Sequence, residues 1–324
     1  MSLEQIYGPI ERELSDVDHV LDDCLKDTAH RPIFRMGNYL SSSKGKRMRP
    51  AMMLLCAKAA GSKKLTSMRN QLVKVAAAVE LIHMASLIHD DIIDHARLRH
   101  HKLTMNCRFG GDTSIAMGDY LYSIAFQLIS GCQNADILGC ISAATKGMCE
   151  GELLQVLDRD NPALLRQRYL MIVKKKTAML FAASCQAGAM VSGCSRATQV
   201  MFEKYGLNFG IAFQIADDCL DLTGDVKSSG KSIGSDFRMG ELTLPLLNLI
   251  SGSKYKKEIL SLLKAQDKEQ AFKEIKKRFL DSGAYLKTQE DIKHYIITAK
   301  ESLSGLGRSC FKDSLYALAG QLIE

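Results

Sequence analysis

The sequence predicts an all-α protein, and three observations support this fold class. Only five prolines occur among 324 residues, and none lies between Pro50 and Pro162. Alanine, leucine, methionine, lysine and glutamate, which favour helices, are plentiful. Alternation of apolar and polar residues, which is typical of strands, is hard to find. Long helices that are apolar most of the way around must be covered by other helices, so we expect a helical bundle with a buried central layer.

Helical periodicity and the positions of glycine, asparagine and proline divide the chain into elements. We expect helices at residues 71–95, 113–129, 135–157, 163–192, 198–223 and 242–251, with helix resuming from about residue 255. Pro162 marks the break before the fourth helix. Residues 224–240 are rich in glycine and serine, and a polar segment of this length is typical of a functional lid. No linker is evident, so we expect a single domain over residues 1–324.

Composition and charge narrow the function classes. The net charge of +7 suits phosphorylated molecules, anionic membranes or nucleic acid. Aromatic residues are only 6% and no long basic tract occurs, so a nucleic-acid surface is poorly supported. Residues 1–18 lack the apolar core of a signal peptide, and no uninterrupted apolar run approaches the roughly 18–20 residues of a membrane span. Ten cysteines without a C-x-x-C pair fit reduced, buried thiols. We therefore expect a cytoplasmic protein without a nucleic-acid partner.

Two acidic motifs of the form D-D-x-x-D end two of the expected helices. Their acids are Asp90, Asp91 and Asp94 in the first motif and Asp217, Asp218 and Asp221 in the second. Residues four apart share a helix face, so each motif forms an acidic shelf at the end of an apolar helix. Like charges at this spacing destabilise a helix, and a bound cation relieves the repulsion. Hard carboxylate oxygens suit Mg²⁺, which often bridges to substrate phosphates. One motif alone would be equally consistent with a solvated helix end; the second copy favours a clamp for a metal–diphosphate cluster.

Several basic and polar residues are candidates to bind the same anion. Arginine contacts phosphate in a bidentate manner and lysine acts as a point charge. The candidates are Lys46 and Arg49 in a basic turn, Lys176 and Thr177 in a helix, Gln214 one turn before the second motif, Lys231 in the polar segment, and His83 two turns before Asp90. Read alone, the basic turn and the Lys-Thr pair are more often solvated surface, and a lone histidine is more often part of the core.

These motifs, in this order and spacing, resemble those of the trans-prenyltransferases, the all-E polyprenyl diphosphate synthase family. The similarity extends over residues 20 to 300. It includes the runs G-K-R-M-R-P, E-L-I-H-x-x-S-L-I-H-D-D-x-x-D, M-G-D-Y-L, K-T-A-M-L-F, G-x-x-F-Q-I-x-D-D-x-L-D-x-x-G-D, G-K-S-x-G-x-D and T-L-P. Each run is weak to moderate by itself, whereas the ordered set is specific.

The resemblance implies an isoprenoid-synthase-type helical bundle around a deep central cavity. It implies Mg²⁺-dependent condensation of isopentenyl diphosphate with an allylic diphosphate, such as farnesyl or geranylgeranyl diphosphate. It also implies a homodimer or heterodimer, with transient membrane association for product release. The six aspartates would hold three magnesium ions with substrate bound. The allylic diphosphate would contact Arg99, Lys176, Thr177, Gln214 and Lys231, and isopentenyl diphosphate would contact Lys46, Arg49 and His83.

Two positions depart from the family pattern. The family usually has two adjacent arginines after the first motif, and here they read Arg99-His100. A neutral histidine still donates a hydrogen bond but supplies less charge, which weakens a contact to isopentenyl diphosphate. The family often has a lysine before the T-L-P run, and here Glu241 stands there. Both departures leave open that this protein has low activity without a partner, or that it is one subunit of a heteromeric synthase.

Small residues before the first motif predict a long product. Short-chain members commonly carry an aromatic residue here, and this chain has Ala85 and Ser86. Because each helical turn adds about 5.4 Å, comparable to one isoprene unit, an open tunnel predicts an all-trans product of about 30–50 carbons, with octaprenyl as the central expectation. If another side chain such as Met84 closes the tunnel, the product is farnesyl or geranylgeranyl diphosphate. Terpene cyclases, head-to-head synthases and metal phosphohydrolases are rivals that leave the second motif or the basic turn unexplained.

Overall fold

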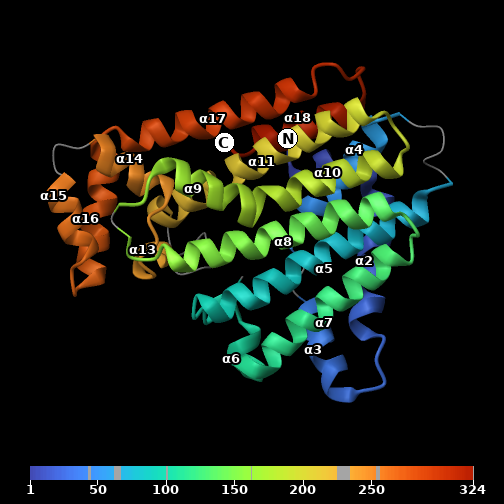
Figure 1. Cartoon of the computed structure of the whole chain (residues 1–324), viewed down its shortest axis with the longest axis horizontal. Coiled ribbons are helices and arrows are strands. Elements are labelled where there is room, and N and C mark those ends of the chain that lie inside the picture. Colours follow the sequence, from blue (N-terminus) through green and yellow to red (C-terminus); the bar gives the residue numbers. More distant parts are fainter. Residues whose placement is uncertain are drawn as a thin grey trace.

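The computed structural model describes residues 1–42, 45–61, 67–99, 101–161, 163–224, 234–252 and 256–323. In these ranges the protein is helical apart from loops and one hairpin whose two strands have two residues each. The predicted all-α class is confirmed. Figure 1 shows α14, α15 and α16 at one end of the elongated molecule, with α2, α3 and α4 toward the other.

The elements follow one another from a short capped N-terminal helix to a C-terminal helix. The first part contains α1 (Leu3–Tyr7), η1 (Gly8–Ile10), α2 (Glu11–Lys26), α3 (Arg31–Ser41), α4 (Met48–Ala59) and α5 (Arg69–Ile93). The middle contains β1 (Leu98–Arg99), β2 (Lys102–Leu103), α6 (Met105–Phe109), α7 (Gly111–Ser130), α8 (Ala135–Leu157), α9 (Arg166–Val173), the π-helix η2 (Lys174–Ala178), α10 (Met179–Val191) and α11 (Arg196–Thr223). The last part contains α13 (Ser235–Arg238), α14 (Leu244–Gly252), α15 (Lys256–Leu263), α16 (Lys268–Asp281), α17 (Ala284–Ser302) and α18 (Cys310–Gly320).

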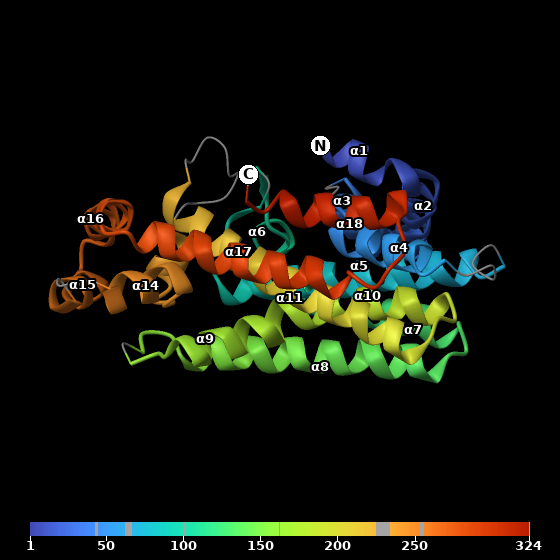
Figure 2. The ribbon, with the colours of Figure 1, turned by 90° about the horizontal axis from the view of Figure 1, so that it is seen from above.

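The long helices form layers around a buried middle. Helix α5 packs on α7, α2, α4 and α10, while α10 packs on α11, α4 and α8. In Figure 2, α8 and α9 lie along one side, and α17 and α18 lie on the opposite side of α10 and α11. Helices α4, α5 and α10 are buried on most of their surface, as their nearly continuous apolar sequences predict.

Glycines allow α10 and α11 to pack closely. A Cβ atom added at Gly206 would lie 2.5 Å from the carbonyl oxygen of Phe181, and one at Gly210 would lie 2.6 Å from the Cα atom of Ala178. No side chain fits at either position, because atoms this close overlap. The close approach brings the start of α10, and η2 before it, directly against α11.

One helix of the described ranges, α5, is long and apolar enough to cross a membrane by length and composition. Its apolar window is 67% buried inside the protein, where α5 residues form part of the hydrophobic core. A second, smaller hydrophobic cluster lies beyond the end of α11. It joins α11 to α13, α14, α15 and α16 through residues such as Leu222, Phe237, Phe272 and Phe279.

Most of the expected helices agree with the structure within a few residues, and three features differ. The helix expected over residues 163–192 is interrupted by the π-helix η2. The polar segment 224–240 contains a short helix, α13, and its residues 225–233 lie outside the described ranges. The β1–β2 hairpin pairs Leu98 with Leu103, and two-residue strands are too short to produce an alternating sequence pattern. Pro162, the expected break, also lies outside the described residues.

Candidate active site

Asp90 and Asp94 stand one turn apart at the C-terminal end of α5, as the motif predicts. The backbone N–H of Asp94 donates to the carbonyl oxygen of Asp90 at 2.8 Å. Burial raises the pKa of the Asp90 carboxyl to about 7. Lys176 opposes this rise, whereas Glu152 and Asp94 add to it. A carboxyl in this environment gains from a neighbouring cation, which favours its charged form.

The middle acid of the first motif, Asp91, is buried and pairs with Arg99. The Arg99 Nε–H donates to Asp91 Oδ1 at 2.9 Å, and Nη2 lies 2.8 Å from the same oxygen. Arg99 lies on strand β1, so the hairpin places the guanidinium beside the motif. The hairpin is itself anchored, because the Tyr39 hydroxyl donates to the Leu103 carbonyl at 2.6 Å. Arg99 and Asp91, both predicted as site residues, thus form an ion pair with each other in the structure.

The second motif, at the end of α11, is held by hydrogen bonds. Asp218 is buried and accepts from the Tyr169 hydroxyl at 2.5 Å and from Gln214 Nε2 at 2.8 Å. Burial raises the pKa of Asp218 to about 7, and the two hydrogen bonds oppose the rise. Asp217 is exposed on the same turn. Asp221 accepts from the backbone N–H and hydroxyl of Ser235, at 3.2 and 2.9 Å, and so caps α13.

Lys176 and Thr177 lie in the π-helix η2, a wider turn that occurs frequently at functional sites. Lys176 forms an ion pair with Glu152 of α8. Burial lowers the pKa of Lys176, but Asp90 and Glu152 outweigh burial and raise it overall. Gly151 makes the approach possible, because a Cβ atom there would lie 2.4 Å from the backbone nitrogen of Lys176. The π-helix therefore places Lys176 between the first acidic shelf and α8.

A hydrogen-bond chain links this helix to the second motif. The Thr177 hydroxyl donates to Gln214 Oε1 at 2.7 Å, and Gln214 in turn donates to Asp218. Three residues predicted as separate diphosphate contacts or metal ligands are thus joined in one network. Tyr169, at the other end of the chain, was not predicted, since a tyrosine 49 positions from its partner gives no local sequence signal.

A second network rests on Arg159, also not predicted. Its Nη2 donates to Asp94 at 2.6 Å and to Glu241 Oε1 at 3.0 Å, and its Nε–H donates to the same Glu241 oxygen at 3.1 Å. Glu241 also accepts from the side-chain amide of Gln155. Burial raises the pKa of Glu241, while Lys176 lowers it. The acid at position 241 is therefore joined to the first motif through Arg159.

The basic turn is fixed by contacts from three elements. The Tyr7 hydroxyl donates to the Lys46 carbonyl at 3.0 Å, and the Lys46 side chain is exposed. Arg47 has a left-handed backbone with a φ angle of 52°. Its guanidinium donates to Asp18 at 2.8 Å and to Glu80 at 3.0 Å. These bonds hold a strained turn in a single conformation.

Arg49 is buried, with 8% of its surface exposed, and its guanidinium carbon lies 4.1 Å from the centre of the Phe181 ring. Burial lowers the pKa of Arg49 to about 10, and Glu80 and Asp90 act against this shift. The charge of Arg49 is thus within electrostatic reach of the first motif. His83 is half-buried on α5, two turns before Asp90. His100 and Lys231 lie outside the described residues.

The two positions expected to set chain length are small and close to the site. Ala85 is fully buried, and Ser86 is half-buried with its hydroxyl bonded to the His83 carbonyl at 2.8 Å. An aromatic residue that was not predicted, Tyr122 of α7, has its ring centre 5.9 Å from that of His89. Burial raises the pKa of Tyr122, and Asp90 is among the acids that add to this rise. Tyr122 therefore lies near the first shelf.

The donor set of the two shelves fits a hard divalent cation. Its members are carboxylate oxygens, and three of the carboxyls, those of Asp90, Asp218 and Asp221, have raised pKa values that a cation would reverse. Within the described residues, no three His, Cys, Asp or Glu side chains converge into a preformed metal cluster.

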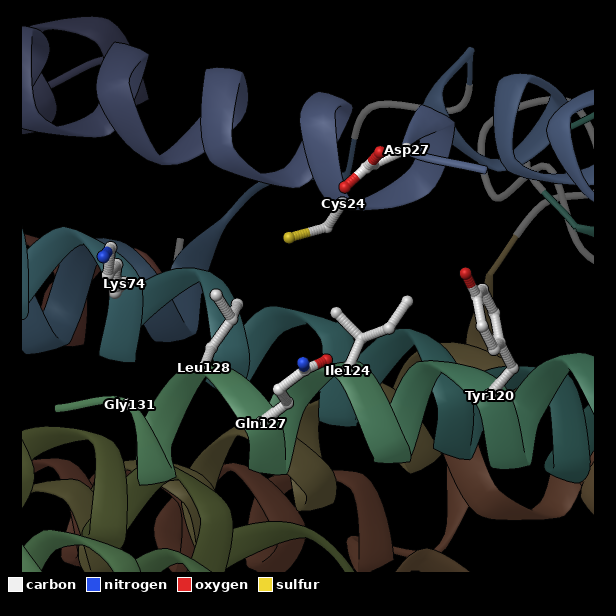
Figure 3. A pocket seen from close by; sticks show the side chains of 8 residues that line it. All are labelled: Cys24, Asp27, Lys74, Tyr120, Ile124, Gln127, Leu128 and Gly131. Atoms are coloured by element: carbon white, nitrogen blue, oxygen red, sulfur yellow. The ribbon is translucent and has the colours of Figure 1, made fainter. Parts of the chain in front are cut away.

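A separate groove of about 330 Å³ lies between α2, α5 and α7 and is lined by Lys74, Tyr120, Ile124 and Gln127 among others (Figure 3). None of the predicted site residues lines this groove.

Comparisons with known proteins show which family and fold this chain is similar to. Residues 30–279 match the model of the polyprenyl synthetase family. The chain is 34% identical over 248 residues to octaprenyl diphosphate synthase of Escherichia coli (strain K12), covering 76% of this chain and 75% of the relative. It is 35% identical over 253 residues to geranylgeranyl diphosphate synthase of Methanosarcina mazei, covering 76% of each.

A solved structure has the same fold. It is a polyprenyl synthase from Caulobacter crescentus CB15, complexed with calcium and isoprenyl diphosphate. The TM-score is 0.91 at 32% sequence identity, and the superposition covers 99% of this chain and 97% of the other. The resemblance stated from the motifs is confirmed, and the all-α bundle is that of these enzymes. This chain therefore belongs to the polyprenyl synthetase family.

Proposed function

We propose that this prenyltransferase condenses isopentenyl diphosphate with farnesyl or geranylgeranyl diphosphate and releases a long all-trans polyprenyl diphosphate of about 30–50 carbons. The observation that carries the proposal is the joining of both acidic motifs to one π-helix. Lys176 connects η2 to the first motif through Glu152 and Asp90, and Thr177 connects it to the second through Gln214. Such a site joins cationic, polar and acidic side chains of α5, η2, α8 and α11 in one region of the protein.

Magnesium ions would be held by acids of the two motifs. The six candidates are Asp90, Asp91, Asp94, Asp217, Asp218 and Asp221. Bound there, the ions would neutralise the diphosphate and stabilise the negative charge that develops on it as it leaves. The calcium in the structure of the Caulobacter crescentus relative supports a divalent cation at this site. Three ions with substrate bound is the number that we propose.

The protein groups act mainly by binding and charge stabilisation. Lys176 and Arg99 place positive charge where the allylic diphosphate departs, which favours breaking of its carbon–oxygen bond. The apolar helices behind the motifs keep water away from the resulting allylic cation. The double bond of isopentenyl diphosphate then forms the new carbon–carbon bond, and a proton leaves to the released diphosphate. Lys46, Arg49 and His83 bind isopentenyl diphosphate, and no protein nucleophile takes part.

Ala85 and Ser86 support a long product, because such small side chains would leave open the tunnel that we propose along α5. Relatedness alone does not decide the length, since the octaprenyl and the geranylgeranyl synthase have nearly the same identity to this chain. We also propose a cytoplasmic dimer of identical subunits that contacts membranes transiently for product release. Glu241, an acid near the first motif, favours a subunit of a heteromeric synthase as the second candidate.

The test uses purified protein, Mg²⁺ and labelled isopentenyl diphosphate with each allylic primer in turn. Products are dephosphorylated and sized by reversed-phase chromatography, with a chelator as the control. We expect chelator-sensitive incorporation into one narrow set of long products. No incorporation with any primer would count against the enzyme acting alone, and a ladder ending at 15 or 20 carbons, about three or four isoprene units, would count against the long tunnel.

A further inference from the structure

The geometry points to Arg159 as a diphosphate-binding residue, which neutralises Asp94 until a cation takes that carboxylate. The inference rests on the proposed function, because it assumes a diphosphate substrate at the two motifs. No motif of the sequence contains Arg159. Its place in the structure, between an acid of the first motif and Glu241, is what assigns it to the site.

The position of Arg159 is fixed by the protein even without Asp94. It follows the end of α8, and the backbone N–H of the next residue, Asp160, donates to the Gly240 carbonyl at 2.9 Å. Gly240 has a φ angle of 75°, and a Cβ atom there would lie 2.2 Å from Asp160 Oδ1. The segment carrying Glu241 is therefore pressed against the end of α8. Glu241 is itself held by Gln155, so its bond to the Arg159 Nε–H persists if Asp94 moves away.

The guanidinium has donors left for a second anion. Arginine presents five N–H groups in a planar fork, and such forks bind phosphate oxygens in pairs. In the structure, Nη2 donates to Asp94 and Glu241, and Nε donates to Glu241. Nη1 makes only a long hydrogen bond, of 3.4 Å, to the Ile93 carbonyl. The Arg159 side chain is 17% exposed and that of Asp94 is 36% exposed. This exposure leaves both side chains partly accessible to solvent.

The charges around Arg159 determine which anion it binds before and after a cation reaches Asp94. Arg159 faces two carboxylates, and Lys176 lies close enough to both Asp94 and Glu241 to shift the charge balance there. A cation bound to Asp94 would compete with Arg159 for the same oxygens and repel it. The Nη2 N–H released from Asp94 and the Nη1 group would then face the diphosphate that arrives with the metal, while Nε and the other Nη2 N–H stay on Glu241. Arg159 would thus exchange one anion for another without leaving its place.

This exchange predicts that one substitution at Arg159 raises the affinity for Mg²⁺ and lowers the affinity for diphosphate. Arg159→Met removes the competitor at Asp94, so Mg²⁺ alone should bind several-fold more tightly. The same variant loses a charged contact, so inorganic diphosphate at saturating Mg²⁺ should bind about 10- to 100-fold more weakly. Both affinities are measured by titration calorimetry on the whole protein. A residue with a merely structural role would weaken both or change neither, and either result would overturn the inference.

Two further variants make the test complete. Arg159→Lys keeps the charge and loses the fork, so Mg²⁺ affinity should stay near that of the wild type while diphosphate affinity falls. Arg278 is the matched control, because it too lies between two acids, Glu258 and Glu274, but in the cluster of α15 and α16. Arg278→Met should change neither affinity. If the wild-type protein itself binds no inorganic diphosphate with Mg²⁺, the proposed function fails; if wild type and Arg159→Met bind it equally, this inference alone fails.

Discussion

The Tyr169 hydroxyl donates a 2.5 Å hydrogen bond to the buried carboxylate of Asp218, across 49 positions of the chain. This bond favours the charged form of the acid against burial, which raises its pKa. Within the part of the chain that the structure describes, Tyr169→Phe leaves Asp218 with Gln214 as its one side-chain donor. We expect kcat/KM for the allylic substrate to fall roughly tenfold at neutral pH, as for a lost buried hydrogen bond to a charged group.

The pH dependence of the same variant separates this role from a packing role. With one donor gone, the pKa of Asp218 rises further, so the acid limb of the pH–rate profile should move to higher pH. The profile is measured at saturating Mg²⁺ for wild type and variant. A uniform loss of rate with an unmoved acid limb would contradict the role assigned to the bond.

The metal-free protein should lose stability as the pH rises. Asp90 and Asp218 have pKa values raised from 3.8 to about 7 in the folded chain, so both bind protons more tightly there than in the unfolded chain. Their contribution to the free energy of unfolding is fully present below the unfolded pKa of 3.8 and is lost progressively as the pH rises to about 7. Thermal unfolding in a chelator should give a midpoint several degrees lower at about pH 8 than at about pH 5.5.

The control for this prediction is the double variant Asp90→Asn, Asp218→Asn. It cannot ionise at either position, so the difference between the two pH values should shrink. Mg²⁺ should raise the unfolding midpoint of the wild type more at the higher pH, where the carboxylates are charged. A wild-type midpoint that rises with pH in the chelator would show that these acids do not control stability.

Ala85→Phe should shorten the product. Ala85 is fully buried one turn before His89, and a ring there would occupy the space next to the first motif. We expect the main product to lose several isoprene units, read by reversed-phase chromatography after dephosphorylation. Ala85→Ser, which keeps a small side chain, is the matched control and should leave the product unchanged. An unaltered length in a folded Ala85→Phe protein would place the tunnel elsewhere.

Gly151→Ala should damage the site through the backbone. The added Cβ atom would lie 2.4 Å from the Lys176 nitrogen, so η2 and α8 must move apart. We expect destabilisation of about 1–3 kcal/mol in denaturant unfolding, together with a loss of turnover. Gly139→Ala lies on the same helix with nothing within 4 Å of its Cβ position, so it should be neutral or stabilise by up to about 1 kcal/mol. Equal effects of the two substitutions would argue against close packing as the cause.

Features that depend on local sequence could be predicted from the chain alone. The sequence predicts α8 over the residues that it occupies, because Gly131 and Asn134 separate it from the preceding helix; the structure adds that the Asn134 side chain caps its start. The two motifs were placed at helix ends because the aspartates follow apolar runs. The basic turn was found from its charge density, and the structure adds the left-handed Arg47 and its partners.

Pairs that meet only in the folded chain could not be predicted. Arg159 and Glu241 are 82 positions apart, and nothing near either residue indicates the other. From the sequence, Glu241 is only an acid at a position where the family often has a lysine, whereas the structure gives it an arginine partner. The π-helix has a different reason for escaping prediction: residues 174–178 have the same helix-favouring composition as a regular turn, and the contact of the wider turn with Gly151 exists only in the folded chain.

The π-helix also behaves as a one-residue insertion in an otherwise continuous helical rod. Helices α9 and α10 each present their apolar faces to neighbours, and the extra residue is accommodated locally between them. Deleting Lys174 should let the rod close into regular α-helix while both flanking faces keep their register. Circular dichroism should then report an intact helical protein and the prenyl-transfer assay almost no turnover, which would show that this rod can fold without the site it carries.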